Sequence, residues 1–375
     1  MIKNVSKFSR ITYKKAVKPI MFLFPADTVH TAIIKSGSII GFIYPICWFF
    51  KLLWAYQNPK VLAQVVNGVY FANPVGLSAG FDKDFKLIKV LPCLGFGFME
   101  LGSMTYKQSL GNPRPHYRRL KKTQSILVYA GLNNQGSKVI IKRIQKHKNK
   151  IIIPLDISVA KTNCDTTITD ETGTKDYIGS LKRLKTAAVS DQITINISCP
   201  NAYGGEPFTT PQKLEKLLYE IDRLSFKKPV YLKMPSDLNW PDFKKLLDVA
   251  LKHNVSGLKI SNLAKDRKLV NAQDKLSEDI PGNMSGIPMQ NLSNQLIQQA
   301  YIYCGDRLII VGIGGIFSAK DAYEKIKHGA SLVELITGMV FEGPELIGQI
   351  NAGLVDLLKK DGYTHISQAI GAYHK

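Results

Sequence analysis

Short apolar runs recur at regular intervals along most of the 375-residue chain, beginning near residue 70. Eight runs of strand length lie at residues 73–80, 95–102, 151–158, 193–198, 230–234, 257–262, 308–315 and 332–338. Longer stretches between them space their apolar residues as helices do, at 211–224, 240–254, 291–304 and 318–330. Strands that alternate with helices form parallel βαβ units, and eight such units are typical of a closed barrel. The pattern therefore predicts an α/β fold, a (β/α)8 TIM barrel, over residues 63–375.

The first 62 residues follow a different pattern. Basic residues alternate with apolar clusters, "PIMFLFP" at 19–25 and "IIGFIYPICWFFKLLW" at 39–54, and Asp27 is the one acid among them. Only 15 uncharged residues separate Lys35 from Lys51, and Pro45 interrupts them, whereas a spanning helix needs roughly 20. This composition predicts a small N-terminal helical segment, residues 1–62, that lies in the membrane interface. A helical cap packed on the barrel is the alternative.

Overall composition narrows the classes of partner. The contents of 45% hydrophobic and 21% charged residues describe an ordinary globular protein. The net charge of +21 favours an anionic partner, such as a phosphorylated cofactor, an acidic substrate or a membrane surface. No nucleic-acid-binding motif accompanies this charge, so we expect no nucleic acid. The five cysteines are widely spaced and include no C-x-x-C pair, which predicts neither a disulfide framework nor a metal site and favours a reducing, cytosolic setting. Together with the N-terminal segment, this predicts a peripheral location on the cytoplasmic face of the membrane.

Polar residues and glycines follow several of the predicted strands, where barrels carry their active sites. Lys83 and Lys233 both fall at strand ends, where an ammonium group could hold an electron-rich ring edge or a substrate carboxylate. Gly286, Gly315 and Gly338 could let backbone N–H groups approach a phosphate. The sequence "GIGGIF" lacks the third glycine of a dinucleotide-binding fingerprint, so a nicotinamide cofactor is not indicated.

The segment "INISCPN", residues 195–201, places a thiol just past a strand. Pro200 follows Cys199 and stiffens the turn, and Asn196 and Asn201 offer donors and acceptors to a planar, amide-rich ring. A buried, inert thiol is the usual fate of a free cysteine. A thiol at this position could instead act as a base or nucleophile if its pKa falls below the ordinary value of about 8.5.

Seven segments in chain order resemble motifs of dihydroorotate dehydrogenase: "NPVGLSAGFDKD", "GFGFMELGSMT", "GLNNQG", "INISCPN", "LKMPSDL", "SGIP" and "VGIGGIFSAKDAYEKIKHGASLVELITGMVFEGP". The resemblance extends from about residue 15 to about residue 350. The N-terminal "FLFPADTVH" looks like the helical region of the membrane-associated, quinone-dependent class 2 enzymes.

The resemblance implies an FMN flavoprotein that oxidises dihydroorotate to orotate in pyrimidine (UMP) biosynthesis. A base removes the C5 proton, C6 gives a hydride to the flavin, and a quinone reoxidises the flavin. By position in the motifs, Cys199 falls on the base, and the substrate positions are Lys83, Asn196, Asn201 and Asn262. The FMN positions are Ala79, Gly80, Lys83, Ser103, Asp156, Asn196, Lys233, Ser261, Gly286, Gly315, Ile336 and Thr337. His30 and Arg119 fall on the quinone tunnel.

Several residues depart from the family pattern. Class 2 enzymes normally carry serine as the base, whereas a cysteine such as Cys199 is typical of class 1, which predicts flavin reduction at lower pH than in the serine enzymes. Asp156 replaces an asparagine beside the flavin, where a carboxylate would disfavour the reduced anionic flavin unless Lys161 or another cation neutralises it.

Three further departures are Val128, Leu263 and His116, which replace an asparagine, a threonine and an arginine. These substitutions leave two alternatives open. One is a flavin oxidoreductase of another dihydropyrimidine or enone-like substrate, and the other is a catalytically inactive FMN-binding barrel.

Overall fold

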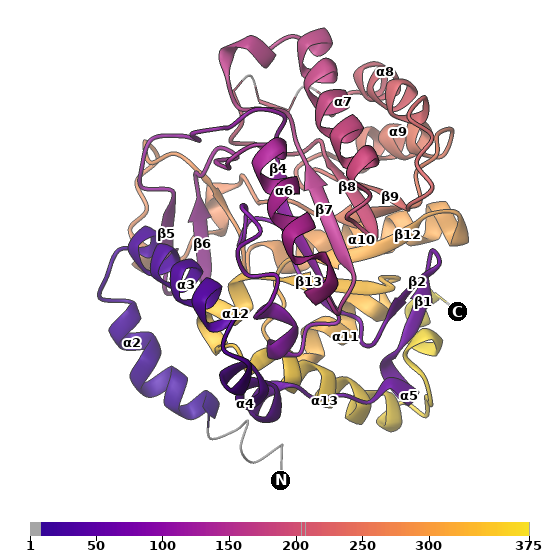
Figure 1. The fold of residues 1–375 in the computed structure, drawn as a ribbon. Coiled ribbons are helices and arrows are strands. Elements are labelled where there is room, and N and C mark those ends of the chain that lie inside the picture. Colours follow the sequence, from indigo (N-terminus) through magenta and orange to yellow (C-terminus); the bar gives the residue numbers. More distant parts are fainter. Residues whose placement is uncertain (1–8, 204, 207, 375) are drawn as a thin grey trace.

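The computed structural model describes residues 9–203, 205–206 and 208–374, so the first eight residues of the expected N-terminal segment lie outside the described part. Eight parallel strands close into a barrel, in the spatial order β10-β12-β13-β3-β4-β7-β8-β9 (Figure 1). They are β3 (Val75–Leu77), β4 (Phe98–Met104), β7 (Leu155–Val159), β8 (Gln192–Asn196), β9 (Val230–Lys233), β10 (Gly257–Ile260), β12 (Ile309–Ile313) and β13 (Leu332–Leu335). Each lies within or overlaps one of the eight predicted runs, and the (β/α)8 TIM barrel is confirmed.

These strands are short apolar runs because both of their faces are covered. Every residue of β8 is buried, although its sequence alternates apolar and polar positions. Helices cover the outside of a parallel barrel and side chains fill its inside, so polar residues such as Thr194 and Asn196 are enclosed as fully as Ile193. Alternation in this strand therefore separates an outer apolar face from a polar interior.

Helices surround the barrel in Figure 1. They are α6 (Ser137–His147), α7 (Asp170–Ala187), α8 (Pro211–Asp222), α9 (Trp240–Ala250), α10 (Met289–Cys304), α11 (Ala319–Lys327), α12 (Thr337–Glu342) and α13 (Leu346–Lys360). The four helical stretches predicted by spacing are confirmed as α8 to α11. Local signals set their starts: the Asn239 side chain accepts the N–H of Asp242 at α9, and Ser318 accepts that of Asp321 at α11.

Two small sheets flank the barrel ends. The hairpin of β1 (Gln64–Val66) and β2 (Val69–Phe71) turns at Asn67-Gly68, where both residues have positive φ. Its Phe71 packs edge-on against Phe98 and covers one end of the barrel. A three-stranded sheet, β5 (Tyr117–Leu120), β6 (Ser125–Val128) and β11 (Asn283–Met284), borders the other end.

The N-terminal region consists of short helices laid against the barrel: a π-helical turn (Tyr13–Val17), α2 (Lys18–Met21), α3 (Ala26–Ile40), α4 (Tyr44–Trp54) and α5 (Pro59–Leu62). In the described part, no helix alone is long and apolar enough to span a membrane; the stretches 9–21 and 26–40 meet the test only together and are bent by 119°. The outward side chains are largely apolar and at least half exposed, namely Ile20, Leu23, Phe24, Ile39, Phe42, Tyr44, Trp48, Phe49 and Leu52.

Candidate functional site

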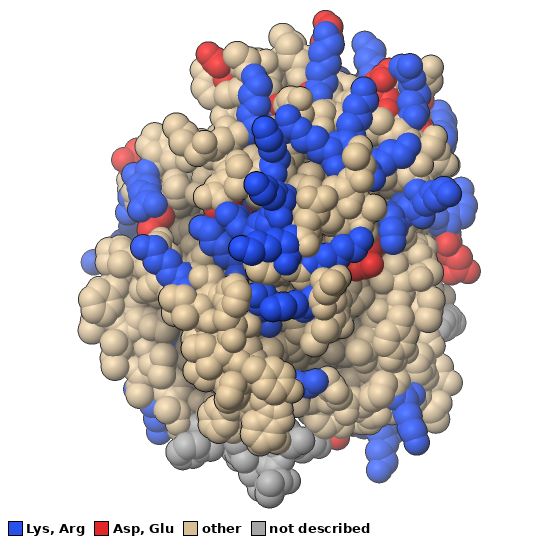
Figure 2. Space-filling view, viewed as in Figure 1, with Lys and Arg blue, Asp and Glu red and all other residues tan. Residues whose placement is uncertain are grey.

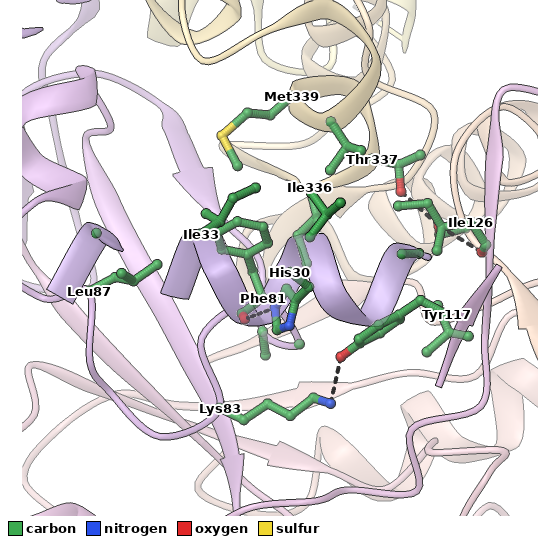
Figure 3. A pocket seen from close by; sticks show the side chains of 18 of the residues that line it. His30, Ile33, Phe81, Lys83, Leu87, Tyr117, Ile126, Ile336, Thr337 and Met339 are labelled. Carbon is green, nitrogen blue, oxygen red and sulfur yellow. Dashed lines mark hydrogen bonds between the residues drawn. The ribbon is translucent and has the colours of Figure 1, made fainter. Parts of the chain in front are cut away.

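A cavity of about 860 Å³ joins the carboxyl ends of the barrel strands to the N-terminal helices. It brings together most of the residues predicted from sequence: His30, Ala79, Gly80, Lys83, Ser103, Arg119, Asn196, Cys199, Asn201, Lys233, Asn262, Ile336 and Thr337. Figure 3 shows Lys83 bonded to Tyr117, with His30 and Phe81 close by, and Ile336 and Met339 on another side of the cavity. Residues that lie more than 300 positions apart in sequence, such as His30 and Ile336, thus line the same cavity.

Four predicted residues do not line the cavity: Asp156, Ser261, Gly286 and Gly315. Gly286 and Gly315 have positive φ, and a Cβ there would lie 2.3 Å from the Gln124 carbonyl oxygen and 2.4 Å from the Gln290 Cβ. Tight packing of the backbone therefore already requires both glycines, and a phosphate contact at either stays a prediction. The Ser261 Oγ is buried with no hydrogen-bond partner among the described residues.

Hydrogen bonds hold the three asparagines around Cys199. The Asn196 amide donates to the Ser103 Oγ at 2.8 Å, and the Asn262 amide donates to the Ser198 carbonyl oxygen at 2.6 Å. The Asn201 amide donates to the carbonyl oxygen of Val128 at 2.9 Å. The strand end and the following turn are thus tied to three different parts of the barrel mouth, which fixes the amide groups for a flat, polar ligand.

The environment of Cys199 differs from the expectation of an acidic thiol. Burial raises the pKa of Cys199 to about 11, while a backbone hydrogen bond from Asn201 and the charges of Lys83 and Lys161 oppose this rise. The side chain is neither fully buried nor exposed. In this arrangement the thiol is protonated at neutral pH, so its action as a base requires loss of that proton first.

Lys83 and His30 approach the cavity from the same side. The Lys83 ammonium donates to the Tyr117 hydroxyl at 2.7 Å and also bonds the Asn133 side-chain oxygen. His30 Nε2 lies 2.7 Å from the Phe81 carbonyl oxygen and therefore donates its proton there. Burial lowers the pKa of His30 to about 4, so the ring is neutral at physiological pH. The predictions did not include Tyr117 or Asn133, although Asn133 lies in the quoted segment "GLNNQG".

A cluster of buried charges lies beneath the cavity, inside the barrel. The Lys259 ammonium contacts Asp156 at 2.9 Å and Glu100 at 3.5 Å and also bonds Glu334, and all four side chains are fully buried. Lys233 lies 3.3 Å from Glu100 and lines the cavity. The cation that neutralises Asp156 is therefore Lys259; Lys161 instead donates to the carbonyl oxygens of Thr167 and Tyr203.

The pKa values of Glu334 and Glu100 in this cluster are shifted in opposite directions. Burial, followed by the nearby charge of Glu100, raises the pKa of Glu334 well above its usual range. The pKa of Glu100 is lowered by Lys233 and Lys259, although its burial opposes this effect. We infer that Glu334 holds a proton beside an ionised Glu100. The Glu100 carboxylate also accepts the backbone N–H of Ala79 at 3.0 Å, which links the cluster to the cavity wall.

The end of the cavity near the N-terminal helices is largely apolar, with Ile33, Phe50 and Leu53 on its wall. Glu345 is an exception, since it is fully buried and neither carboxyl oxygen has a hydrogen-bond partner among the described residues. Burial raises the pKa of Glu345 to about 7. Arg119 also lies at this end, where it donates to the Phe24 carbonyl oxygen at 2.8 Å.

A family profile described as dihydroorotate dehydrogenase matches residues 61–358. The chain belongs to the dihydroorotate dehydrogenase family. Two curated relatives are named dihydroorotate dehydrogenase (quinone): one from Nostoc punctiforme is 32% identical and covers 96% of this chain and 97% of its own length. The other, from Sulfurimonas denitrificans, is 35% identical and covers 96% of this chain and 99% of its own length.

The fold is also shared with a solved structure of the family. The crystal structure of dihydroorotate dehydrogenase from Eimeria tenella in complex with ferulenol superposes with a TM-score of 0.81 at 24% identity, covering 95% of this chain and 99% of that one. Of the departures from the dihydroorotate dehydrogenase motifs, Val128 and Leu263 line the cavity, so apolar side chains stand where the family carries polar ones. His116 does not line it; its ring lies 3.6 Å from Asp27 on α3.

Proposed function

We propose that this chain oxidises dihydroorotate to orotate with FMN as its redox cofactor and a quinone as the electron acceptor, in de novo pyrimidine biosynthesis. The observation that carries the proposal is the single cavity. Its inner end holds Cys199, the asparagines and Lys83, and its outer end lies among apolar residues of the N-terminal helices. A polar, planar substrate and an apolar quinone can therefore reach one site from opposite ends.

The residues at the inner end fit a flavin. Gly80 has φ +115°, and a Cβ there would meet only the Ile336 Cδ1, at 3.8 Å, so the wall is flat and open at this point. Lys233 lines the cavity with an ammonium group that is almost fully buried. The buried hydroxyl of Ser261, which precedes the lining residue Asn262 but does not itself line the cavity, has no partner among the described residues. Bound FMN supplies a two-electron oxidant at this position. Lys233, Ser103 and Asn196 would hold the polar edge of its ring.

Lys83, Asn196, Asn201 and Asn262 would bind the substrate. The ammonium of Lys83 suits the carboxylate of dihydroorotate, and the amides suit its ring carbonyl and N–H groups. Cys199 would remove the C5 proton. Only the thiolate can accept a proton, and burial raises the pKa of this thiol to about 11. The proton-transfer step should therefore become faster as pH rises.

The N-terminal helices would carry the enzyme on the cytoplasmic face of a membrane as a peripheral protein. Their apolar, exposed side chains suit contact with the bilayer interface. His30 and Arg119 would line the path of the quinone. The division into an N-terminal membrane and quinone segment, residues 1–62, and an FMN-binding barrel, residues 63–375, agrees with the end of α5 at Leu62.

Anaerobic mixing of the FMN-loaded protein with dihydroorotate tests the proposal. We expect bleaching of the flavin absorbance, followed by its recovery when a quinone is added, while fumarate leaves the flavin reduced. Cys199→Ala is the matched control, since it should retain FMN but bleach far more slowly. Wild-type protein that binds FMN and stays yellow with dihydroorotate would refute the assignment.

A second candidate substrate follows from Val128 and Leu263. Both line the cavity with apolar side chains, and each lost polar contact to the substrate costs on the order of 1 kcal/mol. Another dihydropyrimidine or an enone-like substrate would need fewer such contacts. Faster flavin bleaching by dihydrouracil than by dihydroorotate would favour this alternative.

A further inference from the structure

A second cavity, of about 710 Å³, lies on the outer surface between the N-terminal helices and α6. One wall comes from the end of α3 and the turn after it, namely Ser38, Ile39, Phe42 and Ile43. The opposite wall comes from residues 85–89 and from α6, which contribute Lys86, Lys89, Lys142, Arg143, Lys146 and His147. We call this cavity the basic pocket. It is separate from the catalytic cavity, and none of its lining residues is acidic.

The charge of the basic pocket is concentrated and largely unpaired. Residues 138–150 contain six lysines and arginines and no acid. Lys142 and Lys146 are exposed and form no ion pair within the described residues. Lys86 pairs with Asp84 at 3.6 Å, and Arg143 is tied to Gln135 at 2.6 Å. Figure 2 shows the blue side chains gathered over α6, next to a broad surface over α3 and α4 with few charges. Positive charge of this density is stabilised by a bound anion.

Lys89 lines the basic pocket between the two walls' charged and apolar side chains. Its Nζ is shielded from solvent and has no hydrogen-bond partner among the described residues. It lies 3.1 Å from the centre of the Phe42 ring, which stabilises the charge but accepts no hydrogen bond. Burial, and then repulsion from Lys150 and Lys146, lowers the pKa of Lys89. An anionic oxygen in the pocket would give this ammonium the acceptor that it lacks.

The apolar wall indicates what kind of anion belongs there. Ile39 and Phe42 are each 64% exposed, and Ile43 is 40% exposed. They continue into the apolar outer surface of α4, where Trp48 and Phe49 are also at least half exposed. A soluble phosphate would use only the lysines. A phospholipid uses both walls, because its phosphate faces the lysines while its acyl chains follow the apolar side chains.

We propose that the basic pocket binds the headgroup phosphate of an anionic phospholipid. This inference rests on the proposed peripheral membrane association, and it assigns that association a specific lipid class. The phosphate bonds Lys89, Lys142 and Lys146, and Phe42 and Ile39 enter the bilayer interface beside it. The contact would hold α3 and α4, which line the outer end of the catalytic cavity, at the membrane surface from which the quinone arrives.

Vesicle co-sedimentation of the FMN-loaded full chain tests the proposal. We expect much stronger binding to vesicles of phosphatidylcholine mixed with phosphatidylglycerol than to vesicles of phosphatidylcholine alone. Lys142→Glu combined with Lys146→Glu should lower the affinity for the mixed vesicles roughly 10- to 30-fold. The matched control is Lys216→Glu combined with Lys320→Glu, which changes the charge equally on exposed lysines of α8 and α11 and should retain most of the affinity.

Three results would overturn the proposal. One is equal binding to both kinds of vesicle, and another is an equal loss of affinity in the two double variants. The third is competition by soluble glycerol phosphate at millimolar concentration, which would assign the pocket to free phosphate. Flavin bleaching by dihydroorotate, measured on the same samples in solution, keeps the two proposals apart. If wild type bleaches but shows no preference for anionic vesicles, only the lipid site fails; if it does not bleach, the proposed activity fails.

Discussion

Replacement of Lys259 by methionine would test the buried charge cluster beneath the catalytic cavity. The substitution keeps an unbranched side chain of similar length and removes the ammonium that contacts Asp156 at 2.9 Å and Glu100 at 3.5 Å. These carboxyl groups and Glu334 are all fully buried, so they would face one another without the central cation.

The expected loss of unfolding free energy in Lys259→Met is large. Removal of one partner from a buried ion pair destabilises a protein by about 3–5 kcal/mol, because the remaining charge is buried without compensation. That is a substantial part of the roughly 5–15 kcal/mol that holds a domain folded. Protonation can relieve the stranded carboxylates, which raises their folded-state pKa. A raised carboxyl pKa gives stability that is present at low pH and lost as pH rises, so the deficit against wild type should be larger at pH 8 than near pH 5.

Urea unfolding followed by fluorescence of the three tryptophans measures this cost at both pH values. The matched control is a double variant that adds Asp156→Asn to Lys259→Met. It removes the carboxylate that Lys259 neutralises, whereas Glu100 keeps Lys233 at 3.3 Å and Glu334 already holds a proton. The double variant should recover most of the lost free energy. A single variant that loses less than about 1 kcal/mol, or a double variant no more stable than the single one, would contradict the reasoning.

Three further predictions concern the catalytic cavity. The variant Glu345→Gln should become more stable relative to wild type as pH rises from 5 to 8. Burial raises the pKa of Glu345 to about 7, so the wild-type protein loses stability over this range as the buried carboxyl group loses its proton. A difference in unfolding free energy that does not change with pH contradicts this prediction. Cys199→Ser should move the pH profile of flavin reduction in stopped-flow measurements to higher pH, since a hydroxyl is a weaker acid than a thiol, and an unmoved profile contradicts it. Lys83→Met should lower the affinity for dihydroorotate at least about tenfold in flavin-bleaching titrations, with FMN still bound, and an unchanged affinity refutes the proposed carboxylate contact.

The pattern of apolar residues predicted the architecture because the spacing of apolar positions is set by the local geometry of each strand or helix. A barrel strand must be apolar at least on the face that packs against the helices, and a helix on the outside of a barrel must repeat its apolar face every 3.6 residues. These rules located all eight barrel strands and helices α8 to α11. The hairpin at residues 64–71 and the sheet of β5, β6 and β11 were not predicted. The strands β1, β2, β5 and β6 are only partly buried, so no continuous apolar run marks them as the buried barrel strands are marked.

The motifs also placed most candidate site residues in one cavity, from His30 in the N-terminal helices to Thr337 near the end of the barrel. Many of these motifs stand at the carboxyl ends of barrel strands, and closure of the barrel brings such ends to the same mouth. For these motifs, chain order and strand direction suffice to predict which segments meet. His30 on α3 and the segments after β6 and β11 reach the cavity by tertiary packing instead.

Only the tertiary structure decided which side chains are partners and which protonation states they take. Lys259 and Glu334 are 75 residues apart and lie inside apolar strands, so nothing local marks them as buried hydrogen-bond partners. The pKa of Cys199 is raised rather than lowered because burial outweighs the nearby lysines. The basic pocket likewise joins α3, residues 85–89 and α6, three segments that are unremarkable apart. Hydrophobic periodicity depends on neighbours along the chain. Desolvation and charge pairing depend on neighbours in space, and these spatial neighbours are determined only when the chain folds into its tertiary structure.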